Sequence, residues 1–169
     1  HGRQVKTIVE KARKTVANLL HASPSEIFFT SGGTEADNMA IARTIYDLGI
    51  THAITSPIEH HAVLHTLEEQ EKQGKIHLDL LRLDEQGNVD LVHLEELLAQ
   101  NPRTLVSIMH ANNEIGNLTD LHKVSAICQR YNAILHLDTV QTMGHYPHDL
   151  TGLKIDFITG AGHKFHGPK

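Results

Sequence analysis

Short apolar runs alternate with amphipathic stretches along the 169 residues, and this alternation constrains the fold more than any other feature. In residues 3–20, apolar side chains recur every three or four positions, which is the period of a helix with one buried face. The apolar runs are mostly continuous, which is typical of strands that helices cover on both faces. The pattern predicts helices over 3–20, 34–48, 60–73, 90–100 and 119–131, and strands over 26–30, 52–55, 76–83, 104–109, 133–137 and 155–159.

Repeated strand–helix–strand units predict an α/β fold of three layers, in which a mostly parallel sheet is flanked by helices and the crossovers are right-handed. In such sheets, ligands bind beyond the carboxyl ends of the strands. Polar residues that follow the predicted strands are therefore the expected site, and they are Ser31 to Thr34, His60, Asn112, Asn113, Asp138 and Lys164.

Composition excludes several classes of partner. The net charge is −5 and no long basic run occurs, so we expect no nucleic-acid partner. No apolar stretch approaches the roughly 20 residues of a membrane span, so we expect no membrane partner either. The single cysteine, Cys128, cannot form an intrachain disulfide and fits a reducing compartment, so we expect a cytoplasmic protein. Its place in a predicted helix beside Val124 and Ile127 indicates a buried structural thiol.

A glycine-rich turn, Ser31-Gly32-Gly33-Thr34, joins a predicted strand to a predicted helix. Glycines let the backbone approach a ligand closely, and a helix N-terminus offers free N–H groups to an anion such as phosphate. The alternative is a plain turn with Thr34 as the helix N-cap. The Gly-Lys-Ser/Thr of a P-loop is absent, which argues against a nucleotide triphosphatase.

Lys164 and Asp138 each follow an apolar strand, in Gly162-His163-Lys164 and Leu135-His136-Leu137-Asp138. An amine nucleophile, a carboxylate that keeps a pyridine nitrogen protonated and a phosphate cradle are what a protein needs to hold pyridoxal phosphate. The alternatives are a solvated surface lysine and an aspartate that caps a turn. Gln141 lies three residues beyond Asp138, where it could contact the phenolic oxygen of the same ligand or lie on the surface.

Two further segments carry polar residues at strand ends. In Glu59-His60-His61, a histidine at a helix start could stack on an aromatic cofactor or move protons, or could simply be solvated. The loop that contains Asn112 and Asn113 could hold a substrate carboxylate, or could be an ordinary turn.

The fifteen histidines leave a non-catalytic metal-binding module as a competing interpretation. His61 and His65 are four residues apart and could share one helix face. Spacing specifies no third ligand, and HExxH and CxxC patterns are absent, so helix-surface histidines are the preferred interpretation and no metal site is predicted. Five others show no clustering in the sequence: His1, His21, His52, His77 and His93.

Together these segments resemble the NifS/IscS-type cysteine desulfurases of the class V aminotransferase group, whose fold is that of aspartate aminotransferase. The resemblance covers essentially the whole chain. Its segments are Thr30-Ser31-Gly32-Gly33-Thr34-Glu35-Ala36-Asp37-Asn38, Glu59-His60-His61-Ala62-Val63-Leu64, Met109-His110-Ala111-Asn112-Asn113-Glu114-Ile115-Gly116, His136-Leu137-Asp138-Thr139-Val140-Gln141, and Gly162-His163-Lys164 with Gly167-Pro168-Lys169.

The resemblance implies a role for each matching residue. Lys164 would hold pyridoxal phosphate covalently and move protons, and His60 would stack on its ring and take part in proton transfer. The remaining cofactor contacts would come from Gly33, Thr34 and His163 near the phosphate, Asp138 at the ring nitrogen and Gln141 at the phenolic oxygen, with Asn113 on the substrate carboxylate.

The implied activity is conversion of L-cysteine to L-alanine, with an enzyme persulfide that supplies sulfur for iron–sulfur clusters or thiolated cofactors. The implied partners are a second copy of the chain, in a homodimer, and sulfur-acceptor or scaffold proteins. A selenocysteine lyase or another class V enzyme is the near alternative.

The sequence also departs from the family pattern. Ala161 stands where the family usually has a serine that helps hold the phosphate. Either this contact is lost, or Thr159 or another group replaces it. Cys128 does not match the persulfide cysteine, and the substrate-binding arginine is absent. We therefore expect residues 1–169 to form most of a cofactor-binding large domain, without the family's N-terminal segment or C-terminal small domain, and to be inactive alone.

Overall fold

The computed structural model describes residues 2–101 and 103–167 and contains one sheet of five parallel strands. The strands are β1 (His52–Thr55), β2 (His77–Leu80), β3 (Leu105–Met109), β4 (Ile134–Asp138) and β5 (Phe157–Thr159). Their order across the sheet is β2-β1-β3-β4-β5, and every neighbouring pair is parallel. The predicted three-layer α/β architecture is therefore confirmed.

The helices also follow the predicted pattern, within a few residues at each end. They are α1 (Gly2–Leu20), α2 (Gly33–Tyr46), α3 (His61–Lys72), α4 (Leu91–Gln100) and α5 (Leu121–Arg130), with short 3₁₀ turns η1 (Pro24–Glu26), η2 (Leu150–Gly152) and η3 (Gly162–Phe165). Gly49 and Gly74 follow α2 and α3 with φ of +67° and +69°, the left-handed conformation in which glycine commonly ends a helix.

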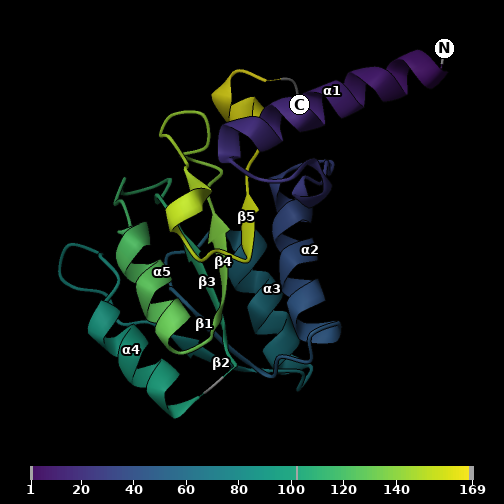
Figure 1. The fold of residues 1–169 in the computed structure, drawn as a ribbon. Helices are drawn as coiled ribbons and strands as arrows, with labels where there is room; N and C mark the ends of the chain where they lie inside the picture. The colour runs from purple at the N-terminus through teal and green to yellow at the C-terminus, as the bar shows by residue number, and fades with distance from the viewer. Residues whose placement is uncertain (1, 102, 168–169) are drawn as a thin grey trace.

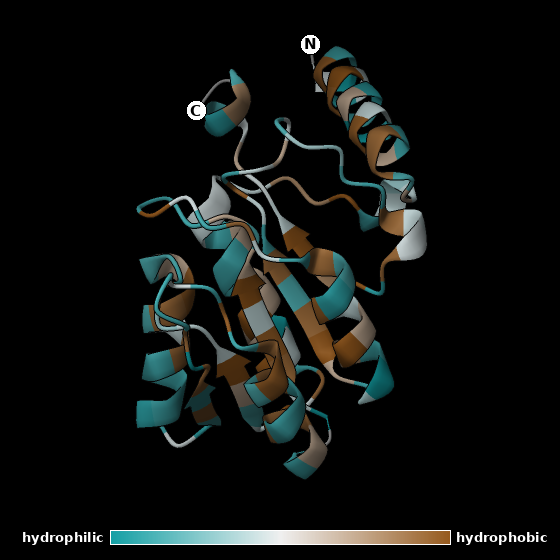
Figure 2. Cartoon of the chain, turned by 90° about the vertical axis from the view of Figure 1, so that its left-hand side faces the viewer, coloured by the Kyte–Doolittle hydropathy of each residue, from teal (hydrophilic) through white to brown (hydrophobic). Residues whose placement is uncertain are grey.

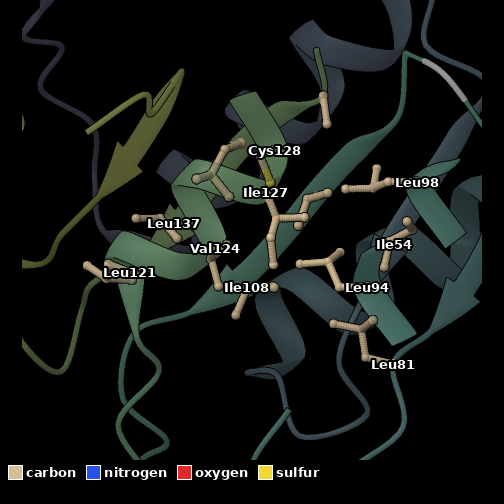
Figure 3. Packing of buried hydrophobic residues seen from close by; sticks show 13 residues of the cluster. Ile54, Leu81, Leu94, Leu98, Ile108, Leu121, Val124, Ile127, Cys128 and Leu137 are labelled. Atoms are coloured by element: carbon tan, nitrogen blue, oxygen red, sulfur yellow. The ribbon is translucent and has the colours of Figure 1, made fainter. Parts of the chain in front are cut away.

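Helices cover the sheet on both faces, as Figure 1 shows with α4 and α5 on one side and α2 and α3 on the other. Along β3 the side chains alternate, so Leu105 packs under α2 and α3 whereas Val106 and Ile108 pack under α4 and α5. Figure 3 shows the second of these cores, in which Leu94 and Leu98 of α4 and Val124, Ile127 and Cys128 of α5 meet the strands. These two cores hold the carboxyl ends of the strands in fixed positions.

The predicted strand over 26–30 is wrong. Pro24–Glu26 forms η1, with Ser23 as a side-chain cap, and no residue of 27–30 pairs with a strand. Ile27 has an extended backbone, but a strand also needs a partner for its N–H and C=O groups, and the described sheet offers none there. Phe28 and Phe29 are consequently exposed by 71% and 51%.

Helix α1 projects from the body of the domain (Figure 1), and Figure 2 shows hydrophobic residues along it. Val5, Ile8 and Leu19 are exposed by 58%, 67% and 72%. An amphipathic helix whose apolar face is open to solvent lacks the surface against which such a face packs. No helix among the described residues has the length and apolar character that crossing a membrane requires.

Candidate active site

A cavity of about 430 Å³ opens at the carboxyl ends of the strands, a volume in the range of small-molecule sites. All eight residues to which the resemblance gives a role line it, and they come from five separate segments: Gly33 and Thr34, His60, Asn113, Asp138 and Gln141, and His163 and Lys164. Ser31, Gly32 and Asn112, which also follow predicted strands, do not line it. Asp37, Met109, Val140 and Ala161 complete the lining. The structure thus brings the predicted residues together, while their chemical roles stay predictions.

The N-terminus of α2 is open toward this cavity. Its N-cap is Gly32, which provides no side chain, so the alternative in which Thr34 is the cap is wrong. By contrast, side chains cap α3, α4 and α5. A Cβ on Gly33 would lie 2.9 Å from Val140 Cγ2, so the glycine lets α2 begin directly against the loop after β4. The free N–H groups of the first turn form a cradle suited to an anion.

Asp138 ends β4 with its side chain almost entirely buried. Burial is the largest cause that raises the pKa of its carboxyl, and the nearby carboxylate of Asp37 raises it further. The Val140 N–H, which donates to Asp138 Oδ1 at 2.9 Å, acts in the opposite direction, as do His136 and His60. A buried carboxylate with a like charge beside it is stabilised in its ionised form by a cationic ligand such as a protonated ring nitrogen.

Asp37 is a second buried carboxylate at the site, and sequence reasoning did not single it out. Thr159 Oγ1 donates a hydrogen bond to Asp37 Oδ1 at 2.5 Å. His136 Nε2 lies 3.5 Å from the same oxygen without forming a hydrogen bond, and His136 Nδ1 lies 2.8 Å from Ser107 Oγ. These side chains form a polar layer between α2 and the sheet, directly behind Asp138.

Two sequence signals bear on this layer. Asp37 lies three and four residues before the buried Ala40 and Ile41 on α2, so helical periodicity alone indicated its burial. Thr159 had been considered a replacement for the phosphate contact that Ala161 cannot make. Its hydroxyl instead donates to Asp37, and Thr159 does not line the cavity.

Glu59 is a further buried acid that the sequence gave no reason to select. Ser56 Oγ donates to Glu59 Oε1 at 2.6 Å, whereas Oε2 has no hydrogen-bond partner among the described residues. Desolvation raises the pKa of Glu59 to about 8, so the side chain is mainly neutral at pH 7. Glu59 therefore adds no full charge beside Asp138 at neutral pH.

His60 is the N-cap of α3, with Nδ1 accepting from the Ala62 N–H at 3.1 Å. That bond fixes the ring and leaves Nε2 to carry the proton of the neutral imidazole. The ring is exposed and borders the cavity, so it can cover a flat ligand.

The two asparagines of the 112–116 loop have different surroundings. Asn112 is buried, donates to the Ile58 carbonyl at 2.7 Å and accepts from the N–H groups of Glu114 and Ile115. It therefore fixes the loop. Asn113 is exposed at the cavity, with Nδ2 donating to Glu114 Oε1 at 2.8 Å, and is the one able to meet a ligand.

Lys164 lies in η3, the short turn that follows β5, and its side chain is exposed at the cavity. Within the described ranges, no carboxylate or hydrogen-bond acceptor holds its amine, while its backbone is fixed by Ala161 O and His145. The predicted Gly167-Pro168-Lys169 segment is described only at Gly167; Pro168 and Lys169 lie outside the described residues.

The chemistry of the cavity fits pyridoxal phosphate. The N-terminus of α2, which has no side-chain cap among the described residues, suits the phosphate. The buried carboxylate of Asp138 suits a protonated ring nitrogen, and Lys164 supplies an amine for covalent attachment.

Cys128 is not suited to act as a nucleophile. It is fully buried in the core under α4 and α5, as the sequence predicted, and burial raises the pKa of its thiol to about 12. A thiol that stays protonated at neutral pH is a poor nucleophile.

Comparison with known proteins agrees with the geometry. The family model described as "Aminotransferase class-V" matches residues 1–169. The cysteine desulfurase IscS of Dictyoglomus turgidum (strain DSM 6724 / Z-1310) is 42% identical over 170 residues, which cover 99% of this chain and 43% of that protein.

Solved structures give the same picture. A NifS-like protein superposes with a TM-score of 0.90 at 40% identity, covering 99% of this chain and 47% of that one. The structure described as SspA in complex with cysteine gives 0.92 at 32% identity, covering 99% and 48%. The chain spans less than half the length of these relatives.

Proposed function

We propose that this chain, which belongs to the class-V aminotransferase family, is the cofactor-binding part of a pyridoxal-phosphate-dependent cysteine desulfurase. The full protein would convert L-cysteine to L-alanine and an enzyme persulfide, the sulfur of which serves iron–sulfur cluster or thio-cofactor assembly. The observation that carries the proposal is the convergence of Lys164, Asp138, His60 and the α2 N-terminus on one cavity. Relatives named cysteine desulfurase at 42% identity support the choice of reaction.

The proposed cofactor contacts follow from the side chains around the cavity. The N–H groups of the first turn of α2, with Thr34 and His163, would bind the phosphate. Asp138 would accept a hydrogen bond from the ring nitrogen, and Gln141 would contact the phenolic oxygen. The ring of His60, held by its bond to the Ala62 N–H, would lie over the cofactor ring.

When bound, pyridoxal phosphate supplies an electron sink for bond breaking at the substrate Cα. Lys164 Nζ holds the cofactor, then accepts the proton from the substrate Cα and returns it to the product. Asn113 Nδ2 orients the substrate by donating to its carboxylate in place of Glu114. Asp37 and the neutral Glu59 are buried near Asp138, and the low dielectric of these surroundings would strengthen the interaction of Asp138 with the ring nitrogen.

The sulfur step needs a second nucleophile. A cysteine thiolate attacks the substrate sulfur, so an S–S bond forms on the enzyme as the carbon–sulfur bond of the substrate breaks. Cys128 is unsuited to this step because it is buried and its pKa is raised. In the proposal, the thiolate and the substrate-binding arginine come from another part of the full protein.

The assembly is also part of the proposal. Apolar side chains on α1 and at Phe28 and Phe29 are exposed. In a homodimer of the full protein, the second copy or the rest of the same chain would cover them. Sulfur-acceptor or scaffold proteins would be transient partners. The cytoplasm, a reducing compartment, is the proposed location.

The test uses the full-length protein. Purified with cofactor, it should show a visible absorption band that Lys164→Ala removes, and borohydride reduction should fix the cofactor onto the peptide that contains Lys164. Lys154→Ala is the matched control, because Lys154 lies outside the cavity and should leave the band unchanged.

The second measurement is the release of alanine and sulfide from L-cysteine in the presence of a reductant. A protein that binds no pyridoxal phosphate on reconstitution would exclude the proposal. Cofactor binding without turnover of L-cysteine, but with release of selenide from selenocysteine, would favour the selenocysteine lyase instead.

A further inference from the structure

Two histidines and an aspartate meet at the edge of the sheet opposite the cavity. His52 and His77 are the first residues of β1 and β2, and they are direct partners in the parallel register of these strands. Asp79 lies two residues beyond His77, so its side chain leaves the same face of the sheet. The pairing of β1 with β2 therefore places three potential metal ligands side by side, although nothing in their spacing along the sequence indicated it.

The ligand atoms lie within the reach of one ion. His52 Nε2 is 2.7 Å from Asp79 Oδ2, and His77 Nε2 is 3.5 Å from Asp79 Oδ1. One ligand atom from each of the three residues lies within 4.8 Å of the others. Ligands at tetrahedral positions around zinc, with bonds of about 2.1 Å, are about 3.4 Å apart. The cluster thus needs only a small widening of the His52–Asp79 contact.

The contacts of His52 hold its ring toward Asp79. Thr104 Oγ1 lies 2.6 Å from the carbonyl oxygen of Asn101, to which it can donate its only proton. When it does so, the contact of 2.8 Å between His52 Nδ1 and Thr104 Oγ1 has the imidazole donating from Nδ1. In a neutral imidazole Nε2 then presents a lone pair to the Asp79 carboxylate, which also has only acceptors.

In that orientation His52 Nε2 and the Asp79 carboxylate are two acceptors 2.7 Å apart, which a metal ion between them would bind together. The same ion would also reach His77, whose ring stacks on that of His52 with centroids 5.4 Å apart. An imidazole that donates from Nδ1 to an oxygen while Nε2 faces a ligand site is the usual arrangement at metal centres.

Burial and charge at the cluster also suit a metal. The side chains of His52 and Asp79 are exposed by 10% and 27%, whereas that of His77 is exposed by 69%, so an ion can enter from the His77 side. Glu71 Oε1 lies 3.8 Å from His77 Nδ1 and adds negative charge nearby, while accepting the Leu78 N–H. Water would complete the coordination.

We propose that His52, His77 and Asp79 bind a divalent transition-metal ion such as zinc, through the Nε2 atoms of both histidines and a carboxylate oxygen. The ion would join the edge strand β2 to β1, and its site is separate from the cavity at the carboxyl ends of the strands. Among the described residues, no other group of three His, Cys, Asp or Glu side chains meets the same distance criterion. His61 and His65, whose ring centroids are 4.5 Å apart on α3, have no third ligand within the part of the chain that the structure describes.

The test measures zinc binding by the full-length protein after removal of any purification tag and of bound metal with a chelator. Titration calorimetry with zinc chloride and elemental analysis of the dialysed protein should give about one zinc ion per chain at this site. His77→Gln and Asp79→Asn should each raise the dissociation constant at this site by about tenfold or more. His65→Gln is the matched control, an exposed helix histidine that should leave binding unchanged.

The position of His77 at the surface keeps the test independent of folding, which circular dichroism of each variant verifies. X-ray absorption at the zinc edge should show two imidazole ligands with oxygen and no sulfur. The proposal is overturned if zinc is not bound, if binding persists in His77→Gln and Asp79→Asn, or if His65→Gln weakens it equally. Binding through sulfur alone would assign the metal to a cysteine elsewhere in the protein and would also exclude this site.

Discussion

Glu59→Gln should stabilise the protein, and the gain should grow as the pH rises. The folded pKa of Glu59 is about 8, against an ordinary value of 4.5. Between these values the folded state holds a proton that the unfolded state has released, so the free energy of unfolding falls as pH increases. The fall is about 1.4 kcal/mol per pH unit, or nearly 3 kcal/mol over about two units. Glutamine keeps the acceptor for Ser56 Oγ but cannot ionise, so the variant lacks this slope.

The assay is urea unfolding of the full-length variant and parent at a series of pH values between about 5 and 9. The difference in free energy of unfolding should be small near the acid end, widen through neutral pH, and level off above the folded pKa of about 8. Glu68→Gln, at an exposed site on α3, the helix that begins just after Glu59, controls for the lost formal charge. Parallel curves for Glu59→Gln and the parent would refute the reasoning, because they would mean that Glu59 is ionised inside the fold.

Two further predictions follow from burial and exposure. Cys128→Ala should lower the free energy of unfolding by about 1–2 kcal/mol, because it leaves a small cavity under α5. The variant should still form the persulfide. Loss of the persulfide while the cofactor stays bound would contradict this prediction. The isolated chain 1–169 should aggregate, because Ile8, Leu19 and Phe28 are exposed by 67%, 72% and 71%, and a monodisperse, cooperatively melting sample in ultracentrifugation and calorimetry would argue against this.

Much of the fold follows from local patterns. The five helices and five of the six predicted strands are present, because apolar periodicity reports which face of each element is buried. Two observed strands are shorter than predicted, because strand pairing stops earlier. The strand predicted over 76–83 is β2, which ends at Leu80, and the strand predicted from residue 155 is β5, which begins at Phe157. The segment 26–30 has the composition of a strand but no partner, and composition cannot reveal a partner.

The candidate site was likewise predictable from the sequence only in part. The general rule for parallel sheets indicated that Asp138, Lys164 and the Ser31–Thr34 turn lie at one edge, and Asp138, Lys164 and the Gly33–Thr34 half of the turn line one cavity. Periodicity on α2 could have revealed the burial of Asp37. The burial of Glu59 had no such signal, because it depends on how β1, β3 and the start of α3 close around it.

The sequence by itself determined the elements of this protein, the edge of the sheet where its polar loops converge, and a family-level pattern of residues around a cofactor. Only the tertiary structure decided which carboxylates are buried away from water, that Asn112 fixes its loop from inside, and that His52 and His77 are neighbours. The physical reason is that periodicity is a property of contiguous residues, whereas desolvation and cross-strand register arise only when distant segments pack together.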